Sequence, residues 1–331
     1  MNSRGRSMHL VWALAAIVYA CSVCQSPAPL IYTPGEGWRY EKAGAEGKWF
    51  RTRAADQLEV AQKAFEAKDF SLAKRAAART VSQWPFSDYA PAAQLLLARS
   101  EAALGNDEKA FKAYQKVVEK YPRIDNYDEV LRQQFEIANK FLAGKWFRLF
   151  GTIPLFPSMD KTIKYYDQIV KSGPYSSVGP EAQMNIGAAH EKKIMKDYPE
   201  AARAYNTVAD RYSDRPVAGE ALFKAGNAYL KQAKTSEYDQ SISTKAIDTF
   251  TDLTERYKDN PSVPEAKQHI EALLLEQARG NFQIARFYDK RRLWEGAQIY
   301  YNEVINKSPE SPMADDARRR IEEIKRRLAA R

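Results

Sequence analysis

One spacing of residues recurs along most of this chain and restricts its fold more than any other feature. A small residue is followed at +3 by a larger one, at +12 by alanine, at +16 usually by an aromatic residue and at +24 by proline. Three copies keep these offsets without a gap and begin at Ala61, Ala98 and Ala285. Three more begin at Ala138, Gly187 and Gly226 and contain insertions or shifted positions. Six copies of one spacing indicate a stack of similar structural units.

Each copy predicts two packed helices, because helical periodicity continues from Arg53 onward and strand signals are absent. The small residue lets the second helix approach closely, and the alanine lies in the same contact. The aromatic residue fills the gap to the next pair, and proline ends the second helix. This is the tetratricopeptide pattern, and it predicts an all-α, right-handed superhelical solenoid of about six helical hairpins.

We expect one array over residues 53–331, without separate domains. The expected hairpins lie near residues 53–86, 90–122, 128–174, 180–215, 217–261 and 264–309. A charged amphipathic helix at 312–330 would cap the open end of the array, with Ile321, Ile324 and Leu328 as its buried stripe.

The first 20 residues are typical of an export signal. Arg4 and Arg6 precede an apolar run over residues 10–20, which is too short to span a bilayer as a helix. Cys21 follows Ala20 as in a bacterial lipobox, which predicts cleavage before this cysteine and its acylation, palmitate included. The alternative is a soluble exported protein with an incidental thiol. Residues 21–52 are rich in proline and glycine and would form a flexible or semi-extended tether.

An aromatic insertion over residues 144–159 interrupts the third copy. Its apolar side chains include Trp146, Phe147, Phe150 and Phe156. Because exposing so many large apolar side chains is costly, the segment either packs on its own scaffold or contacts a partner or a bilayer.

The residues that most catalytic or metal sites require are missing. Both cysteines precede residue 25, the three histidines are far apart, and no phosphate-binding loop or hydrolase motif occurs. We therefore expect no catalytic residue, no cofactor and no metal site. The formal net charge is +9. For an exported protein, basic runs such as 290–292 and 318–320 indicate a protein or lipid partner and no nucleic acid, or simply solvation of an end helix.

Four features give the chain a resemblance to the BamD-type outer-membrane assembly lipoproteins. They are the signal with Cys21, the WPFSDY joint at residues 84–89, Tyr121-Pro122 with the later Phe-Gly insertion, and Arg291 and Trp294 in the sixth copy. The resemblance covers residues 53–174 and about 264–330. Residues 175–263 look like two additional hairpins.

The resemblance implies a non-catalytic scaffold on the periplasmic face of the outer membrane of a Gram-negative bacterium, anchored by lipid. In that family the N-terminal repeats receive unfolded outer-membrane proteins, which assigns a substrate groove to Tyr89, Tyr114, Tyr127 and Phe135. The C-terminal repeats dock the barrel-forming BamA subunit, which assigns that role to Arg291 and Trp294. Other assembly lipoproteins are further expected partners.

A different periplasmic tetratricopeptide adaptor, for envelope constriction or peptidoglycan synthesis, is the alternative. Such adaptors usually begin with a coiled coil, and no heptads precede Arg53.

Overall fold

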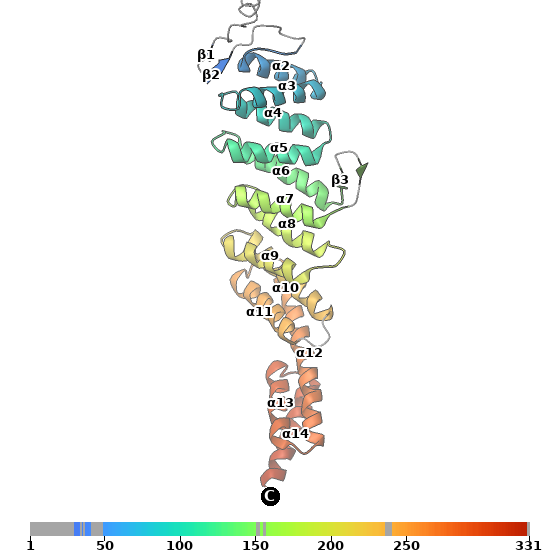
Figure 1. Cartoon of the computed structure of the whole chain (residues 1–331). Helices are drawn as coiled ribbons and strands as arrows, with labels where there is room; N and C mark the ends of the chain where they lie inside the picture. Colours follow the sequence, from blue (N-terminus) through green and yellow to red (C-terminus); the bar gives the residue numbers. More distant parts are fainter. Residues whose placement is uncertain are drawn as a thin grey trace, which may run out of the picture. The chain divides into compact units, whose positions relative to one another are not determined.

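The computed structural model describes residues 30–33, 35, 37–40, 49–149, 153–154, 157–235 and 240–329. Within them the chain forms thirteen helices and two short antiparallel strand pairs (Figure 1). The helices are α2 (Ala54–Glu66), α3 (Phe70–Gln83), α4 (Ala90–Ala103), α5 (Asp107–Lys120), α6 (Tyr127–Leu142), α7 (Met159–Ser172), α8 (Gly179–Glu191), α9 (Tyr198–Arg211), α10 (Val217–Thr235), α11 (Gln240–Arg256), α12 (Val263–Lys290), α13 (Trp294–Lys307) and α14 (Pro312–Ala329). The strand pairs are β1 (Leu30–Thr33) with β2 (Gly37–Tyr40), and β3 (Arg148–Leu149) with β4 (Ile153–Pro154). The predicted all-α class with helical hairpins is confirmed.

Contacts group the chain into two compact units, Met1–Ile124 and Asp125–Arg331, in place of the single body expected. The first unit holds the hairpins α2–α3 and α4–α5, and the second holds α6–α7, α8–α9, α10–α11 and α12–α13, followed by α14. Each hairpin of such an array contacts only its neighbours. One link, here residues 121–126 with Pro122, is therefore enough to divide the chain.

Local sequence explains where the helices begin and end. Asp69, Ser158 and Asp197 cap α3, α7 and α9, each accepting a hydrogen bond from a backbone N–H three residues later. Second helices end shortly before a proline, as α3 does before Pro85 and α5 before Pro122. The predicted role of proline as the end of each second helix holds at these positions.

In two copies the small residue is a glycine that makes room for an aromatic ring of the same hairpin. A Cβ added to Gly187 on α8 would lie 2.5 Å from the ring of Tyr205 on α9. A Cβ added to Gly226 on α10 would lie 2.5 Å from the ring of Phe250 on α11. The ring therefore packs on the first helix of its own hairpin. The spacing predicted only that the ring fills the gap to the next helix pair.

A tyrosine just after several second helices donates a hydrogen bond to the link that follows the preceding hairpin. The hydroxyl of Tyr121 donates to the carbonyl of Pro85 (3.3 Å) in the first unit. In the second unit Tyr212 donates to Pro174 (2.7 Å) and Tyr257 donates to Ser213 (2.9 Å). Burial raises the pKa of Tyr212, so this hydroxyl remains a donor at neutral pH. This tyrosine position is not part of the repeat spacing.

Part of the expected tether is folded onto the first unit. β1 and β2 pair through a turn at Gly35, whose positive φ glycine tolerates, and the carbonyl of Gly35 accepts a hydrogen bond from the N–H of Asp88 (2.6 Å). The guanidinium of Arg79 lies 4.6 Å from the ring centroid of Phe50. Within the segment 21–52, predicted to be a flexible or semi-extended tether, these described residues have ordered contacts with the first unit.

Candidate binding surfaces

The turn between α12 and α13 carries the first candidate surface. Arg291 is exposed at the end of α12, and its guanidinium lies 4.2 Å from the ring centroid of Phe287. Phe287 and Leu293 are both half-exposed beside it. Arginine and aromatic side chains carry much of the binding energy at many protein interfaces, and here both are exposed at the end of α12, beside Leu293. We call Phe287, Arg291 and Leu293 the α12–α13 surface.

Trp294, the second residue expected to dock a partner, is buried. It begins α13 and packs in the core that α12, α13 and α14 share. The guanidinium of Arg327 lies 5.8 Å from the centroid of its ring. Trp294 thus supports the α12–α13 surface from behind, and the expectation that it contacts a partner directly is corrected.

A polar network closes the same end of the unit. Arg320 on α14 donates two hydrogen bonds to the carboxylate of Asp289 on α12 (2.5 and 2.9 Å) and pairs also with Glu323. Tyr301 on α13 donates to the same carboxylate (3.2 Å). Burial, followed by the charge of Asp289, raises the pKa of Tyr301 to about 12. The network joins three helices, and sequence reasoning missed it because Asp289 and Arg320 share no local pattern.

α14 caps the unit as expected, with one difference. Ile321 and Ile324 are buried in the core, but Leu328 is partly exposed. Arg318 and Arg319 pair with Asp315 and Asp316 on the helix surface, in contrast to Arg320.

A groove of about 510 Å³ lies between the first helices α8 and α10. Its lining combines hydrogen-bonding, charged and apolar side chains: Ser177, Glu181, Met184, Asn185, Arg215 and Lys224 belong to it. An extended peptide offers backbone N–H and C=O groups and alternating side chains, which such a mixed lining can satisfy.

The four aromatic residues predicted to line a substrate groove have different environments. Tyr89 and Tyr114 belong to the first unit, and Tyr127 and Phe135 belong to the second. Tyr114 is 1% exposed and Phe135 packs edge-to-face on Tyr166, so both are core residues, and their predicted substrate contact is corrected. Tyr89 and Tyr127 are partly exposed, and the Tyr127 hydroxyl donates to the carbonyl of Ser172 (3.0 Å).

The aromatic insertion is held by one of its rings. Phe147 is fully buried and stacked on Phe141 of α6, with 4.0 Å between ring centroids. The ammonium of Lys161 on α7 lies 4.9 Å from the Phe147 centroid. Trp146, the preceding residue, is 53% exposed. Phe150 and Phe156 lie outside the described residues.

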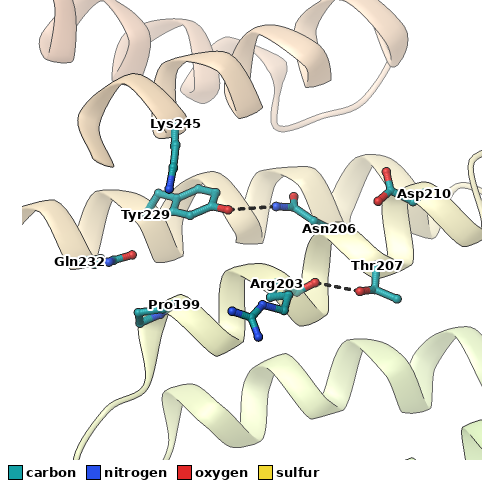
Figure 2. A pocket seen from close by; sticks show the side chains of 8 residues that line it. All are labelled: Pro199, Arg203, Asn206, Thr207, Asp210, Tyr229, Gln232 and Lys245. Atoms are coloured by element: carbon teal, nitrogen blue, oxygen red, sulfur yellow. Dashed lines mark hydrogen bonds between the residues drawn. The ribbon is translucent and has the colours of Figure 1, made fainter. Parts of the chain in front are cut away.

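A second hollow, of about 370 Å³, lies over α9, α10 and α11. Figure 2 shows Asn206 donating to the hydroxyl of Tyr229 (3.2 Å), with Arg203 and Lys245 on either side. Arg203 already pairs with Glu200 (2.9 Å) and is largely exposed. The residues that line the hollow include no histidine and no cysteine.

The described residues contain neither a metal-binding cluster nor a membrane-spanning helix. No group of three or more histidine, cysteine, aspartate or glutamate side chains in this part of the chain could hold a metal ion. None of the described helices is both long and apolar enough to cross a membrane. Cys21 lies outside the described residues.

Comparison with known proteins points to one family. The model of the YfiO outer membrane lipoprotein family matches residues 157–329, more than half of the chain, and a tetratricopeptide repeat model matches residues 92–123. The family match runs through residues 175–263, where the resemblance seen in the sequence is weakest, and does not include residues 53–156.

Individual relatives are distant. The outer membrane protein assembly factor BamD of Helicobacter pylori is 24% identical over 150 residues, which are 45% of this chain and 67% of that protein. The serine/threonine-protein kinase PknD of Protochlamydia amoebophila is 36% identical over 69 residues, which are 21% of this chain and 7% of the kinase. A solved tetratricopeptide repeat protein of Parabacteroides merdae is 11% identical, with a TM-score of 0.32 over 80% of this chain and 96% of that one. At that TM-score the likeness supports no conclusion.

Proposed function

Because this chain belongs to the YfiO family of outer membrane lipoproteins, we propose that it is a subunit of the machinery that assembles outer membrane proteins. The chain is a non-catalytic scaffold, as the matched lipoprotein and tetratricopeptide families are. Its proposed role is therefore to bind other proteins. The observation that supports this role most is the unbroken family match from α7 to α14, which includes the α12–α13 surface.

The α12–α13 surface docks a BamA-like barrel-forming subunit in this proposal. Arg291 is the charged member of this surface. Its exposed guanidinium lies beside the face of the Phe287 ring. Arginine and aromatic residues lose much affinity when truncated at interfaces, because they bury a large area and make directional hydrogen bonds. Trp294 holds the backbone of the turn from the core side.

Unfolded outer-membrane protein segments bind, in the same proposal, along the face of the first helices. The groove between α8 and α10 supports this, since its mixed lining suits an extended peptide. Companion lipoproteins of the assembly machinery would bind elsewhere on the scaffold. The chain would be held at the periplasmic face of the outer membrane by acyl groups on Cys21, which the mass of the purified chain would reveal.

The amount of barrel protein that co-purifies with the chain tests the docking role. Membranes containing tagged chain are solubilised in detergent, and the amount of barrel protein recovered with the tag is measured. Arg291→Ala should lower recovery about tenfold or more, since a well-packed interfacial arginine contributes about 2 kcal/mol. Arg203→Ala, which changes another exposed arginine, on α9, should leave recovery unchanged.

Two outcomes would overturn the proposal. If Arg291→Ala and Arg203→Ala recover the barrel protein equally, the α12–α13 surface is not its docking site. If the unmodified chain recovers cell-division or peptidoglycan factors and no barrel protein, the assembly role itself is wrong. Circular dichroism of each variant should show the helical content of the parent, because both arginines are exposed.

A further inference from the structure

The turn between α8 and α9 exposes two adjacent apolar side chains at its tip. Residues 192–197 read Lys-Lys-Ile-Met-Lys-Asp, and Ile194 is 100% exposed while Met195 is 86% exposed. Single apolar residues at a surface are ordinary, but a contiguous pair at a protruding tip marks a contact site. Neither the docking surface nor the groove described above includes them.

Ion pairs and hydrogen bonds fix this turn beside the aromatic insertion. Lys192 donates to the carbonyl of Leu142, the last residue of α6 (3.2 Å), and Lys193 pairs with Asp160 at the start of α7 (3.1 Å). Trp146 follows Leu142 by four residues, and the burial of Phe147 holds it at this edge. In Figure 1 the α6–β3 connection and the α8–α9 turn lie on the same side of the second unit.

The geometry points to this edge, formed by Trp146, Ile194 and Met195, as a site that inserts into the surface of an anionic lipid bilayer. Lys192 and Lys196 are exposed in the turn, and Lys145 precedes Trp146. The nearby acids Asp160 and Asp197 share Lys193, and Glu191 pairs with Lys231. The three further lysines outnumber the one excess carboxylate, so the edge is basic. Basic residues beside an anionic leaflet are attracted to its head groups, while apolar side chains reach the acyl boundary.

Charge and shape favour a bilayer over a protein partner. Lysine is depleted at the centres of protein interfaces, whereas tryptophan and lysine are typical of side chains at a membrane surface. Lysine can keep its ammonium among head groups while its stem lies along apolar neighbours. The apolar side chains of Ile194 and Met195 lie exposed on a turn, a position from which they can enter a soft surface.

The inference rests on the proposed function only in that an outer membrane lipoprotein is held close to a bilayer. Stable membrane attachment needs more than one weak signal, and this edge would add to an acyl anchor and orient the second unit. Binding to protein-free vesicles does not involve the α12–α13 surface. Failure of the vesicle experiment would therefore leave the docking proposal intact, and the reverse also holds.

The test measures binding of the full chain, carrying Cys21→Ala so that it is not acylated, to vesicles that can be sedimented. The vesicles contain phosphatidylglycerol and phosphatidylethanolamine, or phosphatidylcholine alone. Replacing both apolar tips (Ile194→Ser with Met195→Ser) should lower affinity for the anionic vesicles about tenfold or more. Lys196→Glu should also lower it, and added salt should lower it further. Residues 1–20 are common to all variants, so their contribution is the same in each.

Tyr175→Ser is the matched control, because Tyr175 is also a well-exposed apolar residue but lies in the link between α7 and α8, at the other end of these helices. This variant should bind the vesicles as the parent does. Equal affinity of the parent and the double-serine variant would overturn the proposal, including the case in which the turn serves a protein partner. Equal affinity of the parent for both kinds of vesicle would also overturn it.

A second measurement does not depend on how the rest of the chain binds. An environment-sensitive fluorophore is attached through Ile194→Cys, or through Tyr175→Cys, in a chain whose Cys21 and Cys24 are replaced by serine. Emission from position 194 should shift to the blue on anionic vesicles, and emission from position 175 should not. An unshifted emission at position 194 would overturn the proposal.

Discussion

The α10–α11 hairpin and the α12–α13 hairpin of the second unit follow one repeat pattern but are stabilised differently. In the α10–α11 hairpin the ring of Phe250 lies directly on Gly226, in a core that also includes α9 and α12. In the α12–α13 hairpin the small residue is Ala285, the aromatic residue is Tyr301, and the Tyr301 hydroxyl joins Asp289 and Arg320.

The position in the array explains the difference. An interior hairpin is covered by neighbours on both sides, so apolar contacts alone can bury both of its faces. The α12–α13 hairpin packs against α14, a helix rich in charge, and the ion pair of Arg320 with the largely buried Asp289 fixes that helix in one orientation. Buried polar pairs generally contribute orientation more reliably than net stability.

Removing the ring of the interior hairpin should produce the largest loss. Phe250→Ala leaves a cavity at a fully buried site and should lower the free energy of unfolding of the second unit by about 3–5 kcal/mol. Gly226→Ala should also destabilise, because overpacking costs about 1–3 kcal/mol. That cost exceeds the gain of about 1 kcal/mol from alanine as a better helix former. Urea unfolding followed by circular dichroism measures both effects.

The double variant makes this prediction specific to the ring. Without the Phe250 ring the new methyl group no longer clashes with a side chain, so Gly226→Ala should be neutral or stabilising in the Phe250→Ala chain. Equal destabilisation by Gly226→Ala in both backgrounds would show that the ring does not account for the glycine.

Breaking the ion pair of the last hairpin should have an intermediate effect. Arg320→Ala leaves the carboxylate of Asp289 largely buried, with the Tyr301 hydroxyl as its remaining side-chain donor among the described residues. The expected loss is about 2 kcal/mol, since Arg320 is itself partly exposed to solvent. Arg319→Ala, which removes an exposed pair one residue earlier, should cost at most about 0.5 kcal/mol. Similar losses in the two variants would mean that burial of the pair does not matter.

The comparison also shows which parts of the fold the sequence could predict. The hairpins follow from periodicity, small residues and prolines that act within about 24 residues of each other, so a single sequence contains the signal. The pair of Asp289 and Arg320 spans 31 residues and depends on how α14 packs, for which no local pattern exists. The same limit applies to the site residues.

Residue type alone could not separate exposed from buried members of a predicted site. Arg291 and Trp294 come from one motif, yet one is exposed and the other is in the core. Tyr114 occupies the aromatic position of its repeat, which predicts that it fills a gap between helices, so its burial could have been expected from the spacing. Ile194 and Met195 lie in a turn between two repeat positions, and only the coordinates show their exposure.

The smallest expected effect comes from a polar contact with little burial. At the start of α6, Asp128 accepts hydrogen bonds from the hydroxyl (2.6 Å) and the N–H (3.0 Å) of Ser177, and these bonds lower the pKa of its carboxyl group. A lowered pKa means that the carboxylate stabilises the folded state above the unfolded pKa of about 4, and that this contribution is lost as the pH falls through the folded pKa. The melting temperature of the parent should therefore exceed that of Asp128→Asn by a small margin at pH 7, and the margin should shrink below pH 4. A margin that stays constant or grows in acid would show that the charge of Asp128 is not the cause. Because the Asp128 side chain is nearly half-exposed, its replacement should lower the melting temperature less than Arg320→Ala does. Equal decreases in the two variants at pH 7 would contradict the view that burial sets the strength of these polar contacts.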